Sequence, residues 1–340
     1  MFKLALGNIC TFNFNGKKEN MAVNTAIIGL GIMGRRMLEH MRYHKSYNPN
    51  ILWYPDPDAC ALALSQAPGS TIAHNAETAI ANADLVYLAC TPITRKEYSL
   101  AAAAVGKAIL LEKPLGIDIN ESVHLVDQLN QSGVPAAVNF TQASGIALNA
   151  VSSAISKGHL GEVVGIDIVI TYANWPREWQ KAADWLRFRV EGGMTREVIS
   201  HFLFFAERIL GPLHLVWSRP SYPLDKALCE TQMLARLETK GGCPVTVMAS
   251  VGGAQPDRQE LTVKGSKISR RISEFYHETS STGGEFLPVA SPPKDSRSVA
   301  FKTQLDELLL CLDRKPNRLA TPKEALRVQC LIEHMLLGKS

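Results

Sequence analysis

Lys113, Glu197 and His201 are the side chains in this sequence whose types best suit acid–base chemistry. A lysine at the end of a strand can hydrogen-bond a substrate oxygen and stabilise the negative charge that develops there. Glu197 and His201 lie four residues apart and would face one side of a helix, where a carboxylate can orient a neutral histidine that accepts a proton. Taken alone, these residues leave a surface lysine and an ordinary helical polar pair open as interpretations.

A glycine-rich turn near the start of the chain can bind phosphate groups. Gly29, Gly31 and Gly34 form the pattern G-x-G-x-x-G between an apolar run at 26–28 and helix-forming residues at 35–40. In a dinucleotide-binding turn, the first glycine permits the bend, the second lets the backbone approach a pyrophosphate, and the third lets the helix pack on the strand. The helix N-terminus then presents free N–H groups to the phosphates.

Asp56 stands where a dinucleotide fold places the carboxylate that binds the adenosine ribose. It follows an apolar run at 51–54, and it follows the glycine turn by roughly the 20 residues that such folds use. A carboxylate there would repel a 2′-phosphate, which favours NAD. The alternative is that Asp56 only starts a turn between two prolines. NADP is not excluded, because three arginines lie nearby: Arg35, Arg36 and Arg42.

These residues need a scaffold, and the pattern from residue 24 to about 140 predicts one. Apolar strands at 26–28, 51–54, 71–73, 84–90, 108–111 and 136–140 alternate with helical stretches. That alternation predicts a parallel, doubly wound α/β sheet, a Rossmann domain over 22–140. Ligands of such sheets bind at the carboxyl ends of the strands. The residues expected to face that crevice are Gly29, Asp56, Thr91, Lys113 and Asn139.

The pattern changes after a helix predicted at 146–156. Alternating runs at 161–172, 213–217, 231–237, 245–251, 260–263 and 270–275 have few helices between them, which predicts an α+β second domain over 141–340 with a largely antiparallel open sheet. A helix is expected at 194–210, and the Ser-, Gly- and Pro-rich stretch 279–297 is expected to be a long loop. Two final helices are expected near 300–312 and 322–337, with packing back on the first domain left open.

Composition narrows the classes of function. The 340 residues suffice for two domains, and 46% hydrophobic with 20% charged residues is typical of a soluble globular protein. A net charge of +4 gives no reason to expect nucleic acid, and no apolar run is suited to a membrane. Seven scattered cysteines and nine histidines without ligand spacing predict a reducing, cytoplasmic setting and no metal. Residues 1–21 are expected to be a tail without the features of a signal peptide.

Four stretches together resemble the glucose-fructose oxidoreductase / inositol dehydrogenase (Gfo/Idh/MocA) family, and they span nearly the whole chain after Met21. The resemblance implies NAD(P)-linked redox chemistry on sugars or cyclitols, a Rossmann domain, and an open sheet that contacts the substrate and other subunits. It assigns Lys113 and His201 as the catalytic lysine and histidine, with Glu197 where an aspartate is usual. The stretches are Gly29 to Gly34 with Asp56, Glu112-Lys113-Pro114, Gly192-Gly193 with Glu197 and His201, and Ala320-Thr321-Pro322 with Glu333.

Three departures from the family pattern bear on the substrate. Lys96 replaces a frequent histidine, residues 141–143 lack a frequent arginine, and Phe204 replaces a frequent aspartate. Together with Phe202 and Phe205, Phe204 gives His201 an apolar neighbourhood. Such a neighbourhood would lower the pKa of His201 and keep it a neutral base. The same neighbourhood would also suit a core histidine.

A group of aromatic residues and arginines precedes the helix at 194–210. Trp175, Trp179 and Trp185 could form a wall for a sugar, with Arg187 or Arg189 binding an anionic group. We favour packing and surface charge for these residues, because that is the commoner role of such side chains.

We therefore interpret the chain as an NAD(P)-dependent dehydrogenase or reductase that acts on a secondary alcohol or ketone of a sugar-like or cyclitol substrate. The alternative is a catalytically weak dinucleotide-binding sensor or structural subunit. The expected partners are a small-molecule substrate and copies of the chain in a homodimer or homotetramer. The expected catalytic residues are Lys113, His201 and Glu197, and the expected substrate-binding residues are Lys113, Asn139 and His201. The expected cofactor-binding residues are Gly29, Gly31, Ile32, Met33, Gly34, Asp56, Thr91, Pro92, Glu112 and Lys113.

Overall fold

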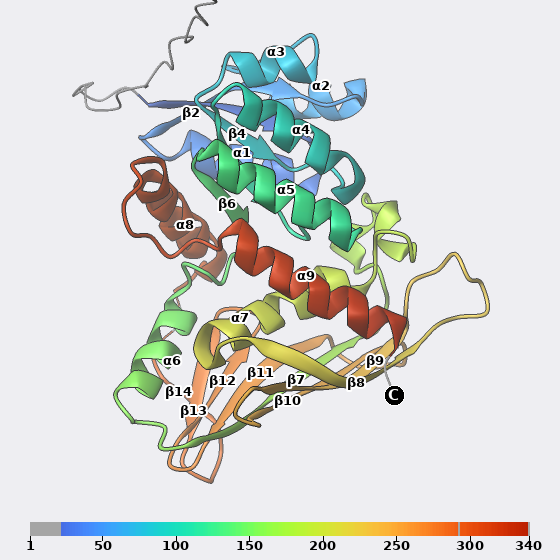
Figure 1. Cartoon of the computed structure of the whole chain (residues 1–340), viewed down its shortest axis with the longest axis vertical. Coiled ribbons are helices and arrows are strands. Elements are labelled where there is room, and N and C mark those ends of the chain that lie inside the picture. The colour runs from blue at the N-terminus through green and yellow to red at the C-terminus, as the bar shows by residue number, and fades with distance from the viewer. Residues whose placement is uncertain (1–21, 292, 339–340) are drawn as a thin grey trace, which may run out of the picture.

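The computed structural model describes residues 22–291 and 293–338, so the predicted tail 1–21 lies outside the described residues. The first part of the chain forms a six-stranded sheet in the order β3-β2-β1-β4-β5-β6, and all its paired strands are parallel (Figure 1). This confirms the predicted doubly wound sheet. Its strands are β1 (Val23–Ile28), β2 (Tyr47–Trp53), β3 (Thr71–Ile72), β4 (Leu85–Leu88), β5 (Ala108–Glu112) and β6 (Ala136–Asn139).

A short polar side chain caps the start of three of the six helices described in this part: α2 (Pro57–Gln66), α3 (Ala76–Ala81) and α5 (Ile119–Ser132). Asp56, Asn75 and Asp118 each accept hydrogen bonds from backbone N–H groups in the first turn that follows, and so satisfy donors that have no partner within the helix. Such caps fix where these strand–helix connections end at the edge of the sheet. The other helices are α1 (Ile32–Arg42), α4 (Pro92–Ala104) and, before the second sheet, α6 (Ile146–Ser156).

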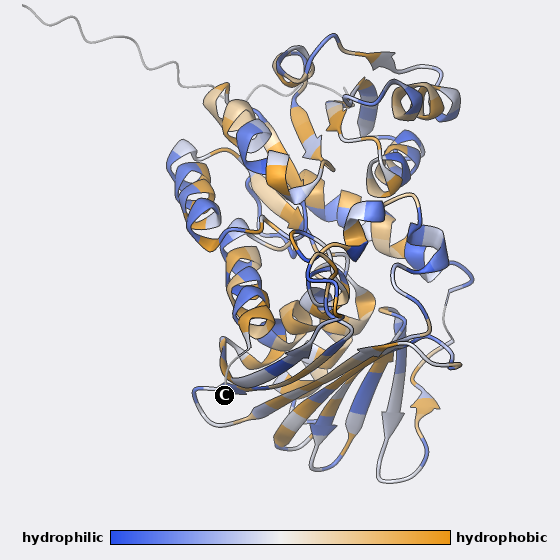
Figure 2. Ribbon diagram, turned by 90° about the vertical axis from the view of Figure 1, so that its right-hand side faces the viewer, coloured by the Kyte–Doolittle hydropathy of each residue, from blue (hydrophilic) through white to orange (hydrophobic). Residues whose placement is uncertain are grey.

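The second part is an eight-stranded sheet in the order β14-β13-β12-β11-β7-β10-β9-β8, in which only β10 and β7 pair in parallel among the described strands. Hydrophobic and hydrophilic residues alternate along its strands (Figure 2), so one face packs against helices and the other stays open. Its strands are β7 (Val163–Tyr172), β8 (Leu213–Ser221), β9 (Gln232–Thr239), β10 (Pro244–Val251), β11 (Arg258–Gly265), β12 (Ser269–Ser273), β13 (His277–Ser281) and β14 (Leu287–Pro288).

Helices from the end of the chain join the two parts. α8 (Ser296–Leu312) packs on α1 and β6, and α9 (Pro322–Leu337) lies against α5, α7 (Ser200–Leu210) and β8, which Figure 1 shows as the long red helix between the two sheets. The apolar residues of β6, α7, α9 and the inner face of the second sheet form one continuous buried cluster. The two sheets are therefore held in a fixed relation, and a site between them can be precise.

The predicted loop at 279–297 is wrong in part. The chain pairs there as β13 and β14 at the edge of the sheet, and α8 already begins at Ser296. Its Ser, Gly and Pro content hides the strands, because edge strands are short and need little apolar surface.

Candidate active site

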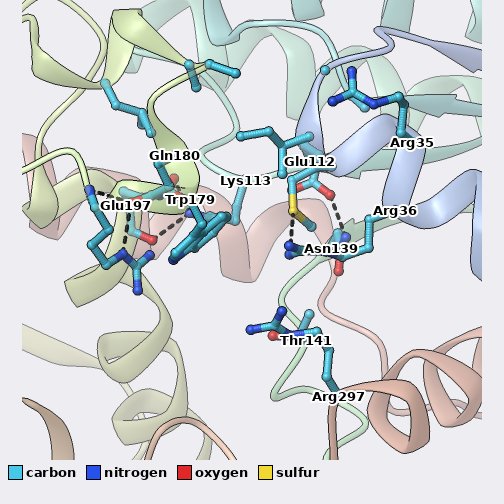
Figure 3. A pocket seen from close by; sticks show the side chains of 18 of the residues that line it. Arg35, Arg36, Glu112, Lys113, Asn139, Thr141, Trp179, Gln180, Glu197 and Arg297 are labelled. Carbon is cyan, nitrogen blue, oxygen red and sulfur yellow. Dashed lines mark hydrogen bonds and ion pairs between the residues drawn. The ribbon is translucent and has the colours of Figure 1, made fainter. Parts of the chain in front are cut away.

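A pocket of about 1030 Å³ lies between the carboxyl ends of the first sheet and the segment that precedes α7, and residues of the second sheet and the start of α8 complete it. Its size suits a nucleotide cofactor together with a small substrate. Figure 3 shows Lys113, Trp179, Gln180 and Glu197 on one side of the pocket, with Arg36, Glu112 and Asn139 on the other. Of the predicted site residues, three do not line it: Gly29, Gly34 and Pro92. Those that do are Gly31, Ile32, Met33, Asp56, Thr91, Glu112, Lys113, Asn139, Glu197 and His201.

The three glycines of the turn have three different surroundings. A Cβ on Gly29 would meet Cys90 N at 2.3 Å, and its φ of +100° is one that other residues rarely adopt. A Cβ on Gly34 would lie 1.9 Å from Gly29 O, so α1 packs on the turn through a bare backbone. Around Gly31 there is open space, with nothing within 4 Å of such a Cβ. The turn therefore leaves room at Gly31, beside the N-terminus of α1, for a phosphate group to approach.

Asp56 caps a helix and is also placed to bind a ribose. Its Oδ1 accepts hydrogen bonds from the N–H groups of Asp58 at 2.9 Å and Ala59 at 3.3 Å, which caps α2. The side chain is exposed and lines the pocket, so a ribose hydroxyl can reach its other oxygen. Of the nearby arginines, Arg35 donates to Leu30 O at 2.6 Å and Arg42 donates to Gln66 O, so each has a backbone partner.

Lys113 and Glu197 meet across the pocket. The Lys113 Nζ donates to Glu197 Oε2 at 2.6 Å and to the Glu197 backbone oxygen at 2.6 Å. The lysine side chain is only 7% exposed, so the pair is shielded from water on most sides. A charge in such a setting interacts with a neighbouring oxygen more strongly than it would at the surface.

Glu197, whose backbone oxygen accepts from Lys113, lies in a π-helix, Thr195–Ile199, that leads into α7. Here the Ser200 N–H donates to Thr195 O, five residues back, which widens the turn. The sequence predicted one continuous α-helix over 194–210, and the structure differs from this prediction in the first turn, which is π-helical. Single π-turns of this kind occur often at functional sites.

Contacts from distant parts of the chain hold this π-helix. Arg196 forms a two-pronged ion pair with Glu333 of α9, at 2.7 and 2.8 Å, and also donates to Gly192 O. The buried Glu230 accepts from the Thr195 N–H at 2.7 Å. Its carboxylate lies so close to Gly193 that a Cβ there would meet it at 2.5 Å. The Gly192-Gly193 pair is thus part of the support for Glu197.

His201 lies at the inner end of the pocket. It is 8% exposed, and its ring packs edge-on against Phe140 and Phe275 at centroid distances of 5.5 and 5.3 Å. Its Nδ1 is buried without a hydrogen-bond partner in the described part of the chain. Burial lowers the pKa of His201 well below its usual value, and the positive charges of Lys113 and Arg177 lower it further. The ring is therefore neutral at neutral pH.

Beneath the pocket, Glu112 joins the strand ends into one polar network. Its buried carboxylate accepts from Tyr87 Oη and Asn139 Nδ2, and Asn139 Oδ1 accepts from Gln304 Nε2 at 2.6 Å. Burial raises the pKa of Glu112, and the hydrogen bond from Tyr87 opposes that shift. Asn139 was predicted to bind substrate, and the structure shows both ends of its amide engaged in this network.

The sequence prediction missed the part of the pocket wall formed by Arg177 and Gln180. Arg177 Nε donates to Gln180 Oε1 at 2.8 Å, and Gln180 Nε2 donates to Glu197 Oε1 at 3.3 Å. Trp179 and Trp185, which were judged to be packing residues, also line the pocket. The cluster of tryptophans and arginines in an otherwise irregular stretch was the only signal of this wall.

Two further sequence expectations concern metals and membranes. Within residues 22–291 and 293–338, no group of three or more His, Cys, Asp or Glu side chains could hold a metal ion. In the same part of the chain, no helix has both the length and the hydropathy to span a bilayer.

Comparison with known families matches both parts of the chain. The model of the Gfo/Idh/MocA oxidoreductase family with NAD-binding Rossmann fold matches residues 23–140, and the model of the Gfo/Idh/MocA C-terminal domain matches residues 148–270. An uncharacterised oxidoreductase of Synechocystis is 26% identical over 205 residues, which cover 58% of this chain and 53% of that protein. The chain spans about half the length of the curated relatives it matches first.

Solved structures share the whole fold. An oxidoreductase from Agrobacterium radiobacter, solved with NAD+, L-tartaric acid and magnesium, has a TM-score of 0.80 at 16% identity, and the match covers 92% of this chain and 95% of that one. The WlbA dehydrogenase from Bordetella pertussis, solved with NADH and UDP-GlcNAcA, has a TM-score of 0.77 at 18% identity, with 93% and 97% covered.

Proposed function

The chain belongs to the Gfo/Idh/MocA family of oxidoreductases, and we propose that it is an NAD-dependent dehydrogenase or reductase acting on a secondary alcohol or ketone of a sugar-like or cyclitol substrate. In this proposal residues 22–140 bind the cofactor and residues 141–340 complete the substrate site. The nicotinamide would accept a hydride from the carbinol carbon, and the protein would position the substrate and stabilise charge.

The observation that carries the proposal is the Lys113–Glu197 pair in the pocket that also contains the Gly31 turn. Lys113 would hydrogen-bond the substrate oxygen and stabilise its alkoxide character. The neutral His201 would accept the hydroxyl proton. Glu197 was expected to orient the histidine, but its carboxylate hydrogen-bonds Lys113 and Gln180, so in this proposal it orients Lys113. Reduction of a ketone would follow the same steps in reverse.

The first experiment is turnover. The protein is mixed with NAD+ and a panel of polyols, sugars, cyclitols and hydroxy acids, and NADH is followed by absorbance. Lys113→Ala should lower kcat/KM by about 100-fold while NAD+ affinity is largely kept, because an oxyanion-stabilising group typically contributes about that factor. Lys96→Ala is the matched control, since Lys96 forms only a longer ion pair with Glu121, at 3.5 Å on the surface.

The competing proposal is a dinucleotide-binding sensor or structural subunit with weak turnover. It is favoured by the burial of His201 between Phe140 and Phe275, which limits access to its ring. Tight NAD binding with no NADH formation for any member of the panel would support the sensor. Turnover that depends on Lys113 would exclude it.

We also propose that the chain forms a homodimer or homotetramer through the open face of the second sheet. Large apolar residues lie exposed there, including the cross-strand pair Leu234 and Met248. Light scattering at micromolar concentration tests this proposal, and a monomer would contradict it.

A further inference from the structure

Five arginines line the pocket, and two of them, Arg35 and Arg95, donate to backbone oxygens. The other three, Arg36, Arg177 and Arg297, form no ion pair within the described residues. Carboxylates near them are engaged. Glu197 accepts from Lys113 and Asp295 caps α8, while Glu274 accepts from Gln259 and Asp257 from the Ala173 N–H. On the basis of the dehydrogenase function proposed above, we propose that the substrate carries a carboxylate and that Arg177 binds it.

Arg177 is held rigidly for such a role. Its guanidinium lies over the rings of Tyr172 and Trp179, with Cζ at 4.9 and 4.8 Å from the ring centroids. The hydrogen bond from its Nε to Gln180 Oε1 fixes the plane of the group, and Gln180 is only 1% exposed. The two terminal nitrogens are left for a ligand, and their spacing matches the two oxygens of a carboxylate.

The position of Arg177 ties this subsite to the reacting atoms. One chain of hydrogen bonds runs from Arg177 to Gln180, to Glu197 and then to Lys113. Figure 3 shows Gln180, Glu197 and Lys113 together on one side of the pocket. A carboxylate on Arg177 would therefore leave a nearby hydroxyl group of the same molecule close to Lys113. This arrangement fits a sugar acid or a hydroxy acid better than a neutral polyol.

The other two arginines are better placed for the cofactor. Arg36 lies on α1, just after the glycine turn, and Arg297 lies in the first turn of α8. Figure 3 shows Arg297 away from Gln180 and Glu197, and Arg36 lies over the Trp179 ring with Cζ at 5.3 Å from its centroid. Cofactor phosphates could neutralise this pair, so the test must be made with the cofactor already bound.

The same segment contains a natural control. Arg187 forms an ion pair with Asp184 at 2.9 Å, is half exposed, and does not line the pocket. Arg189 stacks on Tyr222 at 3.9 Å and is also absent from the pocket wall. These were the two arginines that the sequence suggested for an anionic group, and Arg177 is the one that reaches the pocket.

The experiment is calorimetric titration of the NADH-saturated protein with pairs of acid and neutral probes. The pairs are D-glucuronate with D-glucose, D-galacturonate with D-galactose, and L-tartrate with L-threitol, and glucose 6-phosphate tests for a phosphate site. In at least one pair the acid should bind at least 10-fold more tightly. Arg177→Met should reduce that ratio by about 10- to 100-fold, the loss of a charged hydrogen bond, and Arg187→Met should leave it unchanged.

Equal affinities within every pair, an unchanged ratio in Arg177→Met, or tighter binding of glucose 6-phosphate than of any acid would overturn the carboxylate assignment. NADH formation from NAD+ and the same probes is measured separately. Arg177-dependent acid binding without turnover would defeat the dehydrogenase proposal and leave the carboxylate subsite standing. Turnover of neutral probes alone would support the dehydrogenase proposal and defeat the carboxylate subsite.

Discussion

Two walls of the pocket, one from the first sheet and one from the segment that precedes α7, are built in different ways. The wall from the first sheet consists of the ends of regular parallel strands and one glycine turn, each at a fixed place after its strand. The wall that precedes α7 consists of short 3₁₀ turns and a π-helix, and it depends on Glu230 and Glu333 from far along the chain. The first wall is therefore set by a regular sheet, and the second by individual side-chain contacts that hold an irregular segment.

The largest effect should come from breaking the tertiary support of the second wall. Arg196 and Glu333 are only 9% and 13% exposed, so Arg196→Met leaves a carboxylate buried without its partner. We expect a loss of about 3–5 kcal/mol in the free energy of unfolding, measured with urea. Lys302→Met, which breaks the exposed pair with Asp306, should cost less than about 1 kcal/mol.

A second substitution on the partner separates the lost charge pair from lost packing. Arg196→Met combined with Glu333→Leu removes the unpaired carboxylate and should recover much of the stability. If the double variant is as unstable as Arg196→Met alone, the loss comes from the other contacts of Arg196, such as its hydrogen bonds to Arg189 O and Gly192 O, and not from the unpaired carboxylate.

A single added methyl group at Gly34 should destabilise the first wall. Gly34→Ala places a Cβ 1.9 Å from Gly29 O, against backbone that cannot move aside easily, and we expect a loss of about 3 kcal/mol in unfolding free energy. Gly31→Ala meets nothing within 4 Å, so it should leave stability nearly unchanged and weaken NAD binding instead. Urea unfolding and calorimetry measure the two effects. Equal stability of both variants would contradict the packing role of Gly34.

A smaller effect is expected on cofactor preference, from a substitution that leaves the fold of the first wall intact. Asp56→Asn keeps the cap of α2, because asparagine caps helices as well as aspartate does. The loss of charge should weaken NAD binding by about 1.5–3 kcal/mol and weaken NADP binding less. Calorimetry that shows tight NADP binding and none for NAD in the parent protein would reject Asp56 as the ribose ligand.

This contrast explains what the sequence could predict. Gly31, Asp56 and Lys113 could be found because each follows a strand at a fixed spacing, and parallel strands bring such residues to one edge. Arg177 and Gln180 could not, because an irregular segment has no period that predicts which side chains point inward. The π-turn at Glu197 was equally hidden, since it differs from an α-helix by one residue per turn and depends on contacts with other elements.

The smallest effect concerns His201, where the two walls meet. Burial lowers the pKa of His201, and Lys113 from the first wall lowers it further, so the ring should still be unprotonated at pH values just below its ordinary value of about 6.5. Between that value and the lowered one, the unfolded chain binds a proton that the folded protein does not. His201 should therefore make the folded state less stable as pH falls through this window, and should have no such effect above it. Nuclear magnetic resonance of the labelled histidine rings measures the titration directly, and Lys113→Met should raise the midpoint of His201. A midpoint at or above 6.5 in the parent protein would mean that the ring is more open to water than its packing against Phe140 and Phe275 implies, and would remove the reason for assigning it as a neutral base.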